Sequence, residues 1–249
     1  MYTSYKMLAH IIPFLALLST ALSSPFPHHS RRTIAGVSVL DTPLVRAAQD
    51  YARAHSSDAV YKHIMRSWLY GTLLLTHNDT LSATVDLEIH AIAILLHDLG
   101  FDQAPNATHI SHNRRFEVDG AIAARQFIRR HNVGRRWDER RVQLVWDAIA
   151  LHSDPKISQY KEPEVEVVGL GINLDFTGPS FGILDAEYAA VVKEFPSDDL
   201  DSAFVDGFTW LCSTKPETTY DTFMQPFGER FVQGYNATGH RAIDEMVAQ

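Results

Sequence analysis

The sequence is poor in cysteine and in positive charge. Cys212 is the only cysteine in 249 residues, so no disulfide can form within the chain, and the class of small disulfide-stapled proteins is excluded. Lysine and arginine number 22 against 30 aspartate and glutamate residues, which gives a formal net charge of −8. This acidic balance argues against a general surface for nucleic acid or anionic membranes. We predict that the arginine-rich residues 129–141 are solvated helix ends around a turn at Gly134.

Beyond its first two dozen residues, the sequence also lacks a long hydrophobic run. Within them, Lys6 precedes an apolar run over residues 8–18, and Ala21-Leu22-Ser23 has the small-x-small pattern of a cleavage site. A membrane span needs about 20 apolar residues. We therefore predict a secretory signal peptide over residues 1–23, a leader over residues 24–32, and no membrane span.

Three Asn-x-Thr sequences agree with export from the cell. They begin at Asn78, Asn106 and Asn236, and each is an acceptor pattern for N-glycosylation. Together with the signal peptide, they predict a secreted glycoprotein.

No linker, repeat or low-complexity stretch interrupts residues 33–249, which favours a single domain there. Apolar residues recur mostly at helical spacing, so we predict an all-α fold. Residues 163–177 contain only short apolar runs and fit either a helix or a strand. The expected helices cover residues 58–75, 82–99, 116–133, 137–153, 184–194, 198–213, 217–233 and 239–248.

The dipeptide His97-Asp98 ends the apolar run of residues 91–96. Imidazole and carboxylate groups are costly to bury without a partner, and together they suit Zn, Fe or Mn. A metal site needs three or four ligands. His63 and Asp175 are candidates, although His63 alone is typical of a core histidine and Asp175 alone of a helix cap or turn carboxylate.

The ordered set of His63, His97-Asp98 and Asp175 resembles the HD-domain superfamily of metal-dependent hydrolases. The surrounding segments are similar, in order and spacing, to the fungal branch that includes cyanamide hydratase-like proteins, over about residues 40–240. These segments are HIMRSWLYG, LLHDLGFD, RFEVDGAIAARQFI, VWDAIALH, KEPEV and GINLDFTGP.

The resemblance implies an all-α HD-domain helical bundle around a metal site. It also implies that His63, His97, Asp98 and Asp175 ligate one divalent ion of Zn, Fe or Mn. Two-metal members carry a histidine where this chain has Phe116, so we predict a single ion and no other cofactor.

Three residues are candidates for roles in the chemistry. Asp98 would orient a metal-activated water and accept its proton. His152, on the inward face of its helix, would donate a proton to a developing anion or else serve as a core histidine bonded to a carbonyl. Arg66 would stabilise developing negative charge or hold Asp98 or Glu117 in place, and we favour the holding role.

These features predict a metal-dependent hydrolase or hydratase that acts on a small-molecule substrate, as the cyanamide hydratase branch adds water to a nitrile carbon. Phosphate substrates call for several cations near the metal, and the sequence offers mainly Arg66, with Arg114 and Arg115 as further candidates. A small, weakly polar substrate is therefore favoured. The sequence does not define an oligomeric state.

Three alternatives stay open at this point. The superfamily's commonest chemistry is the hydrolysis of phosphate esters, so one alternative is a phosphohydrolase. A second is a serine esterase of the α/β-hydrolase type, because residues 178–182 fit the G-x-S-x-G pattern around Ser180. The third is a secreted HD-like domain that binds a ligand without catalysis.

Overall fold

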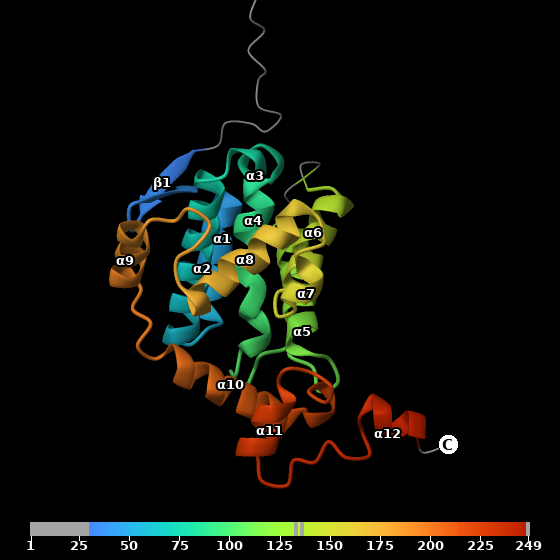
Figure 1. Ribbon diagram of the computed structural model, residues 1–249. Coiled ribbons are helices and arrows are strands. Elements are labelled where there is room, and N and C mark those ends of the chain that lie inside the picture. Colours follow the sequence, from blue (N-terminus) through green and yellow to red (C-terminus); the bar gives the residue numbers. More distant parts are fainter. Residues whose placement is uncertain (1–29, 132–133, 135–136, 248–249) are drawn as a thin grey trace, which may run out of the picture.

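The protein is all-α apart from one small hairpin, and the computed structural model describes residues 30–131, 134 and 137–247 (Figure 1). The signal peptide and most of the leader predicted from the sequence lie outside the described residues. In chain order the helical elements are α1 (Pro43–Ala54), α2 (Asp58–Thr76), α3 (Asp79–Thr84), α4 (Leu87–Leu96), the 3-10 segment η1 (His97–Phe101), α5 (Phe116–Arg130), α6 (Glu139–Ala150), α7 (Pro155–Ser158), α8 (Pro163–Thr177), α9 (Asp185–Glu194), α10 (Leu200–Thr214), the 3-10 segment η3 (Pro216–Thr218), α11 (Gln225–Phe231) and α12 (Ala242–Val247).

The hairpin pairs β1 (Arg31–Ile34) with β2 (Val37–Leu40) in antiparallel register. Ala35 and Gly36 both have positive φ, as a tight two-residue hairpin turn requires. The strand β1 begins at Arg31, so it includes the last two residues of the predicted leader. Strands of four residues are too short to stand out in a sequence pattern.

Polar caps set the beginnings of the central helices. Ser57 accepts a hydrogen bond from the Val60 backbone N–H at the start of α2. Asp86 caps α4 in the same way, so the predicted helix over residues 82–99 is in fact two helices, α3 and α4, with a cap between them. The ambiguous residues 163–177 form the helix α8, and α1 was not predicted.

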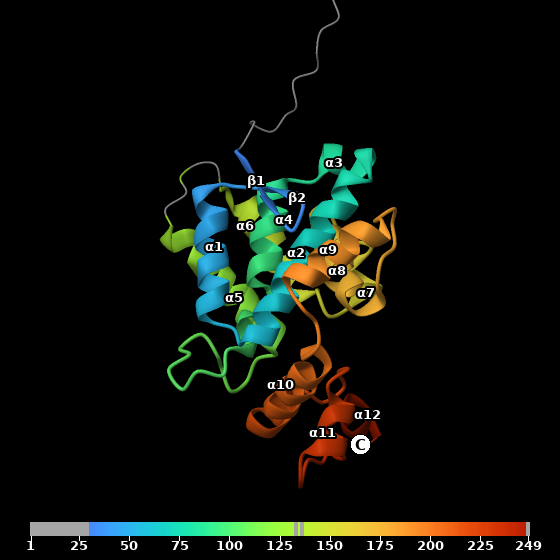
Figure 2. The same ribbon diagram turned by 90° about the vertical axis from the view of Figure 1, so that its left-hand side faces the viewer.

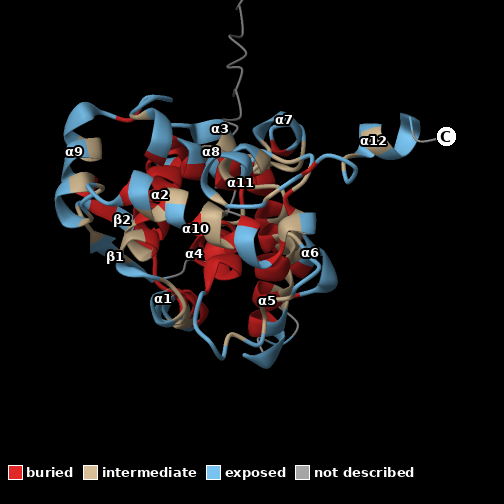
Figure 3. Cartoon of the chain, turned by 90° about the horizontal axis from the view of Figure 1, so that it is seen from below, coloured by how far each residue is buried: buried red, intermediate tan, exposed pale blue. Residues whose placement is uncertain are grey.

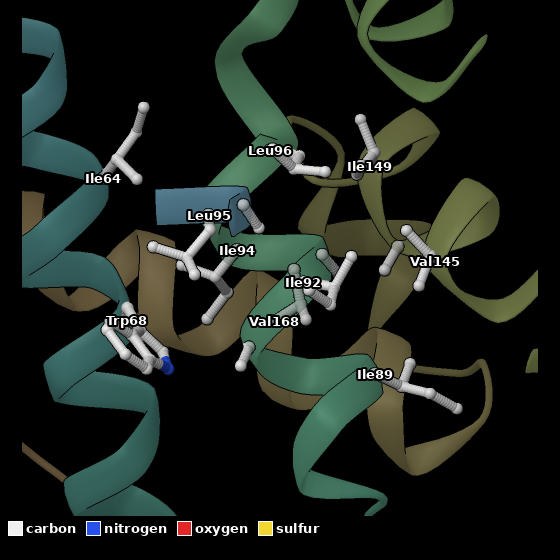
Figure 4. Packing of buried hydrophobic residues seen from close by; sticks show 14 of the residues in the cluster. Ile64, Trp68, Ile89, Ile92, Ile94, Leu95, Leu96, Val145, Ile149 and Val168 are labelled. Carbon is white, nitrogen blue, oxygen red and sulfur yellow. The ribbon is translucent and has the colours of Figure 1, made fainter. Parts of the chain in front are cut away.

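Helix α4 lies at the centre of the hydrophobic core. Every residue from Glu88 to Leu96 is buried, as expected of a helix that is apolar on all sides. Figure 4 shows α4 between Trp68 of α2 on one side and Val145 of α6 on the other, with α8 alongside. The helix therefore fixes the position of His97 and Asp98, which follow its last residue.

Helices α2 and α8 cross at very short range. A Cβ atom on Gly171 of α8 would lie 2.9 Å from the Ser67 carbonyl oxygen and 3.0 Å from the Gly71 Cα atom of α2. Only glycine permits this approach. Because Asp175 follows Gly171 by about one helical turn, the close crossing places its side chain beside the preceding turns of α2.

A second, smaller cluster lies at one end of the bundle, where α10 and α11 pack (Figure 2). It includes Phe101 of η1, Phe116 of α5 and Phe204 of α10. Cys212 is buried in it as a free thiol. Seen from that end, the buried residues gather in the middle of the helices and the exposed ones lie outside (Figure 3). Among the described residues, no helix has the length and apolar character to cross a membrane.

Candidate metal centre

His63, His97 and Asp98 meet at one point in the protein. His63 comes from α2, whereas His97 and Asp98 form the start of η1, where α4 tightens into a 3-10 turn. Asp98 has non-helical backbone angles, φ −97° and ψ 17°. One candidate ligand atom from each residue lies within 4.8 Å of the other two, and all three side chains are buried. The structure thus brings together three of the four ligands that the sequence predicted.

Hydrogen bonds on the far side of each ring orient the two histidines. The Nδ1–H of His97 donates to the Ile94 carbonyl oxygen over 2.7 Å. The Nδ1–H of His63 donates to Asp175 Oδ2, also over 2.7 Å. With both Nδ1 atoms protonated, the two Nε2 atoms carry lone pairs, and they face each other at 3.2 Å.

The carboxylate of Asp98 completes this arrangement of electron-rich atoms. Its Oδ2 lies 3.1 Å from His97 Nε2 and 3.8 Å from His63 Nε2. It is buried and has no hydrogen-bond partner in the described part of the chain. Two imidazole lone pairs and an unpartnered carboxylate oxygen are unfavourable together unless a cation lies between them. The donor set of two nitrogens and one oxygen suits Zn, Fe or Mn.

Asp175 occupies a different position from the one predicted. Its Oδ1 accepts from Arg66 Nε over 2.6 Å, and its Oδ2 accepts from Arg66 Nη2 and from His63 Nδ1, each over 2.7 Å. Both oxygens are thus paired on the side of His63 away from the three ligands. In this geometry Asp175 orients the His63 ring and lies outside the group of three candidate ligands. Three protein ligands with an open position are the arrangement that catalytic zinc sites have.

Arg66 has a partner that the sequence did not predict. We expected it to hold Asp98 or Glu117, and it holds Asp175 instead. Its remaining nitrogen, Nη1, donates to the carbonyl oxygens of Phe195 and Pro196. The side chain is 1% exposed and does not line the cavity described below. Arg66 therefore holds Asp175 and does not face a substrate in that cavity.

The charges of these groups follow from their surroundings. Burial opposes ionisation of Asp98, but the neighbouring His97 outweighs it and lowers the pKa of Asp98 to about 2. Burial likewise opposes the charged form of His97, yet the charge of Asp98 raises the pKa of His97 above its ordinary value. Burial also acts against the charge of Asp175, and its hydrogen bonds from His63 and Arg66 still lower the pKa of that carboxyl. The centre therefore carries two carboxylates near neutral pH.

His152 follows the end of α6 and reaches the same centre. Its Nδ1–H donates to the Ile149 carbonyl oxygen over 2.7 Å, the contact predicted for a core histidine, while its role as a proton donor stays a prediction. Its Nε2 lies 3.8 Å from Asp98 Oδ1. Burial, aided by His97, lowers the pKa of His152 to about 4. The ring is therefore neutral near pH 7, and Nε2 is a proton acceptor.

A cavity of about 240 Å³ opens onto His63, His97, Asp98 and His152. Its polar lining is completed by Ser153 and Asn173. Among the described residues, no lysine or arginine lines it. Most of the wall is aromatic, with six phenylalanines: Phe101, Phe116, Phe176, Phe204, Phe208 and Phe223.

The other cations expected near the metal are engaged elsewhere. Arg114 pairs with Asp119 over 2.8 Å, and Arg115 pairs with Glu117 over 2.5 Å. Neither lines the cavity. The phenylalanine lining of the cavity was not predicted from the sequence, although Phe204 and Phe208 share one face of α10 at i, i+4 spacing.

The serine-esterase alternative fails on the fold. A nucleophile elbow needs a strand before its serine and a parallel sheet around it. Residues 163–177 before Ser180 form helix α8, and the described residues contain only the β1–β2 hairpin as a sheet. Ser180 is exposed in the loop that follows.

Comparisons with known proteins do not place the chain in a family. No protein-family model matches it, and no curated protein matches its sequence.

Proposed function

We propose that the protein is a metal-dependent hydrolase or hydratase of the HD-domain type, acting on a small molecule in the phenylalanine-lined cavity. The observation that carries this proposal is the meeting of His63, His97 and the unpartnered Oδ2 of Asp98 at the polar end of that cavity. The resemblance in residue order noted in the sequence supports it. A bound Zn, Fe or Mn ion would lower the pKa of a water molecule and polarise a substrate atom.

The chain's own residues have separate tasks in this proposal. His63 and His97 would hold the ion through Nε2, and Asp98 would hold it through Oδ2. Asp98 Oδ1 and His152 Nε2 lie 3.8 Å apart, and a water molecule between them would be oriented by both. His152 is neutral, so it would accept the proton of that water, a role that the sequence had predicted for Asp98, and return it to the product atom on which negative charge develops.

The cavity favours a substrate without a phosphate group. Phosphoryl transfer relies on cations around the transferred group, and the three candidate arginines are all engaged in ion pairs away from the cavity. The volume of about 240 Å³ admits only a small molecule. We infer an uncharged substrate with an apolar portion and a carbon, such as that of a nitrile or amide, that water can attack.

The experiment is a substrate panel of nitriles, amides and phosphomonoesters, assayed with metal-loaded protein. Turnover of a nitrile or amide that is lost in His97→Ala is the expected result. His77→Ala is the matched control, because His77 lies at the end of α2, where it bonds Glu187, and outside the cavity. Turnover of phosphomonoesters alone would select the phosphohydrolase alternative, and a metal-loaded protein that binds panel members without converting them would select the ligand-binding alternative.

We also propose that the protein is secreted and glycosylated. Asn78, Asn106 and Asn236 are all exposed, which makes each acceptor nitrogen accessible for glycosylation. Expression in a eukaryotic host should yield protein in the medium, with a mature N-terminus after residue 23 and a mass that falls on treatment with an N-glycosidase. Retention in the cell with Met1 intact and no glycans would contradict this.

A further inference from the structure

A second group of metal-ligating side chains lies outside the proposed active site. It consists of His55 at the end of α1, Asp102 directly after η1, and His109 in the loop between η1 and α5. One candidate ligand atom from each lies within 4.8 Å of the other two. None of the three was singled out from the sequence, because they are far apart along the chain and in no motif.

Both histidines approach the same carboxylate oxygen. Asp102 Oδ2 lies 2.7 Å from His55 Nδ1 and 3.6 Å from His109 Nε2, and the two rings meet edge to face. Asp102 Oδ1 is held by the Ala104 backbone N–H over 2.9 Å. His109 Nε2 also donates to the Leu99 carbonyl oxygen over 3.0 Å. The carboxylate is thus fixed in place, and both imidazoles are directed at Oδ2, which is hydrogen-bonded to His55 Nδ1.

The surroundings favour a cation and give it a route of entry. Asp102 is 6% exposed, whereas His55 is 29% exposed and lines a separate cavity of about 560 Å³. Two further carboxylates, Asp199 and Asp206, line the same cavity, and in the described part of the chain no lysine or arginine does. Acidic walls of this kind raise the local concentration of cations.

We propose that His55, Asp102 and His109 bind a second divalent transition-metal ion, with water completing its coordination. Two imidazoles and one carboxylate form the same donor class as the central site and suit Zn best among abundant ions. The ion would replace the hydrogen bond of His55 Nδ1 to Asp102 and that of His109 Nε2 to the Leu99 carbonyl oxygen, so the His55 ring would carry its proton on Nε2 and the His109 ring on Nδ1. Because His55 is partly exposed, this ion exchanges with solvent more readily than the buried central one.

The position of the site gives the ion a structural consequence. Asp102 ends the segment that begins with His97 and Asp98, so the ion would tie the far end of η1 to α1 and to the loop carrying His109. Phe101, next to Asp102, lines both cavities. We infer that the second ion braces the segment that presents two of the central ligands.

The test is a titration of Zn²⁺ into purified protein dialysed into metal-free buffer, read by calorimetry and by melting temperature. Wild type should take up one exchangeable equivalent and melt at a higher temperature. His109→Gln and His55→Gln should each raise the dissociation constant of that equivalent at least tenfold and lose the rise in melting temperature. His112→Gln is the matched control, since His112 is exposed on the same loop and outside the cluster.

His97→Ala separates this proposal from the proposed function, because it removes a central ligand and leaves the second site intact. This variant should still take up the exchangeable Zn²⁺ equivalent and show the rise in melting temperature, both of which depend on His109. Should His55→Gln not fold, His109→Gln decides alone. Wild type without an exchangeable equivalent, or His109→Gln with undiminished uptake, would overturn the second site and leave the central one untouched.

Discussion

At His63 and His97, the hydrogen bond made by one ring nitrogen decides what the other nitrogen can do. Both Nδ1 atoms donate, one to Asp175 and one to the Ile94 carbonyl oxygen, so both Nε2 atoms are free to bind a cation. The sequence order supplies the pair of histidines, but the tautomer of each ring depends on partners that only the folded chain brings near.

The role of Asp175 is testable with a conservative change. Asp175→Asn keeps an oxygen that can accept the Nδ1–H of His63 but removes the charge that pairs with Arg66. If Asp175 orients His63, metal affinity should fall by about 10- to 100-fold without complete loss of metal. Competition against a chelator measures this, with Asp147→Asn, in a surface ion pair, as the control. Complete loss of metal, as in His97→Ala, would make Asp175 a direct ligand.

His152 should affect turnover without affecting the metal. His152→Gln removes the proton acceptor beside Asp98, and we expect a fall in kcat of about 10² or more with metal content and melting temperature nearly unchanged. His131→Gln is the matched control, because His131 also bonds a helix-end carbonyl through Nδ1 but lies outside the cavity. Full turnover in folded, metal-loaded His152→Gln would refute the catalytic role.

His90 should make the fold sensitive to acid. Burial lowers the pKa of His90 to about 3, from an ordinary value of 6.5. Between these values the unfolded chain binds a proton that the folded chain excludes, so stability falls as the pH falls from about 6.5 toward 3, by up to about 1.4 kcal/mol per pH unit. Above pH 6.5 this group has no effect.

The variant that tests this is His90→Leu, compared with wild type by denaturant unfolding at several pH values. The free energy of unfolding of the variant should depend less steeply on pH below 6.5. His112→Leu, at an exposed position, should leave the slope unchanged. Equal slopes in wild type and His90→Leu would show that His90 is not the acid-sensitive group.

At the scale of elements, the orientation of His63 on α2 depends on the close crossing of α2 and α8, which brings Asp175 beside it. Gly171→Ala would place a methyl group 2.9 Å from the Ser67 carbonyl oxygen, and backbone atoms cannot move aside cheaply. We expect a loss of about 1–3 kcal/mol in the free energy of unfolding, together with weaker metal binding, because Asp175 would move away from His63. Thermal and chelator titrations measure the two effects.

Gly169→Ala is the control for this prediction, since it lies two residues earlier in the same helix. Its added Cβ would meet only the Ser158 side chain, at 3.0 Å from Oγ, which can rotate. Alanine also favours a helix over glycine by about 1 kcal/mol. Gly169→Ala should therefore be neutral or mildly stabilising, and a Gly171→Ala variant as stable as Gly169→Ala would contradict the close crossing.

How much of the fold was predictable varies from element to element. Helices α2, α5 and α6 were predicted from apolar periodicity and end signals, which are local properties of the sequence. The cap at Asp86 was not predicted, because the residues on both sides of it fit one helical pattern over residues 82–99. For residues 163–177, short apolar runs fit either state, and only packing against α2 selects the helix.

In the candidate site too, local features were predictable from the sequence and contacts between distant residues were not. His97 and Asp98 were conspicuous because an apolar run ends in two polar side chains, a contrast visible in the sequence. The pairing of Arg66 with Asp175 was not, since the two residues are 109 positions apart. The same holds for His55, Asp102 and His109, whose contact exists only once α1, η1 and the following loop are packed.

At the scale of the whole molecule, the main helical bundle and the smaller cluster at its end both line the cavity at the candidate metal centre. The main bundle supplies His63, His97, Asp98 and His152, and the smaller cluster at its end contributes Phe204 from α10, whose ring meets the His63 ring edge to face. Closing a polar centre with aromatic side chains excludes water and strengthens the electrostatic interactions inside. The arrangement suits the hydrolysis or hydration of a small, uncharged molecule with an apolar portion, as proposed above.

The most direct test of the central claim is metal analysis of protein dialysed into metal-free buffer. Wild type should retain about one equivalent of Zn, Fe or Mn per chain, held by His63, His97 and Asp98. His97→Ala and Asp98→Ala should each lose that retained ion, while His77→Ala should keep it. Full metal content in both His97→Ala and Asp98→Ala, or a wild type that is folded and binds no transition metal, would contradict the account.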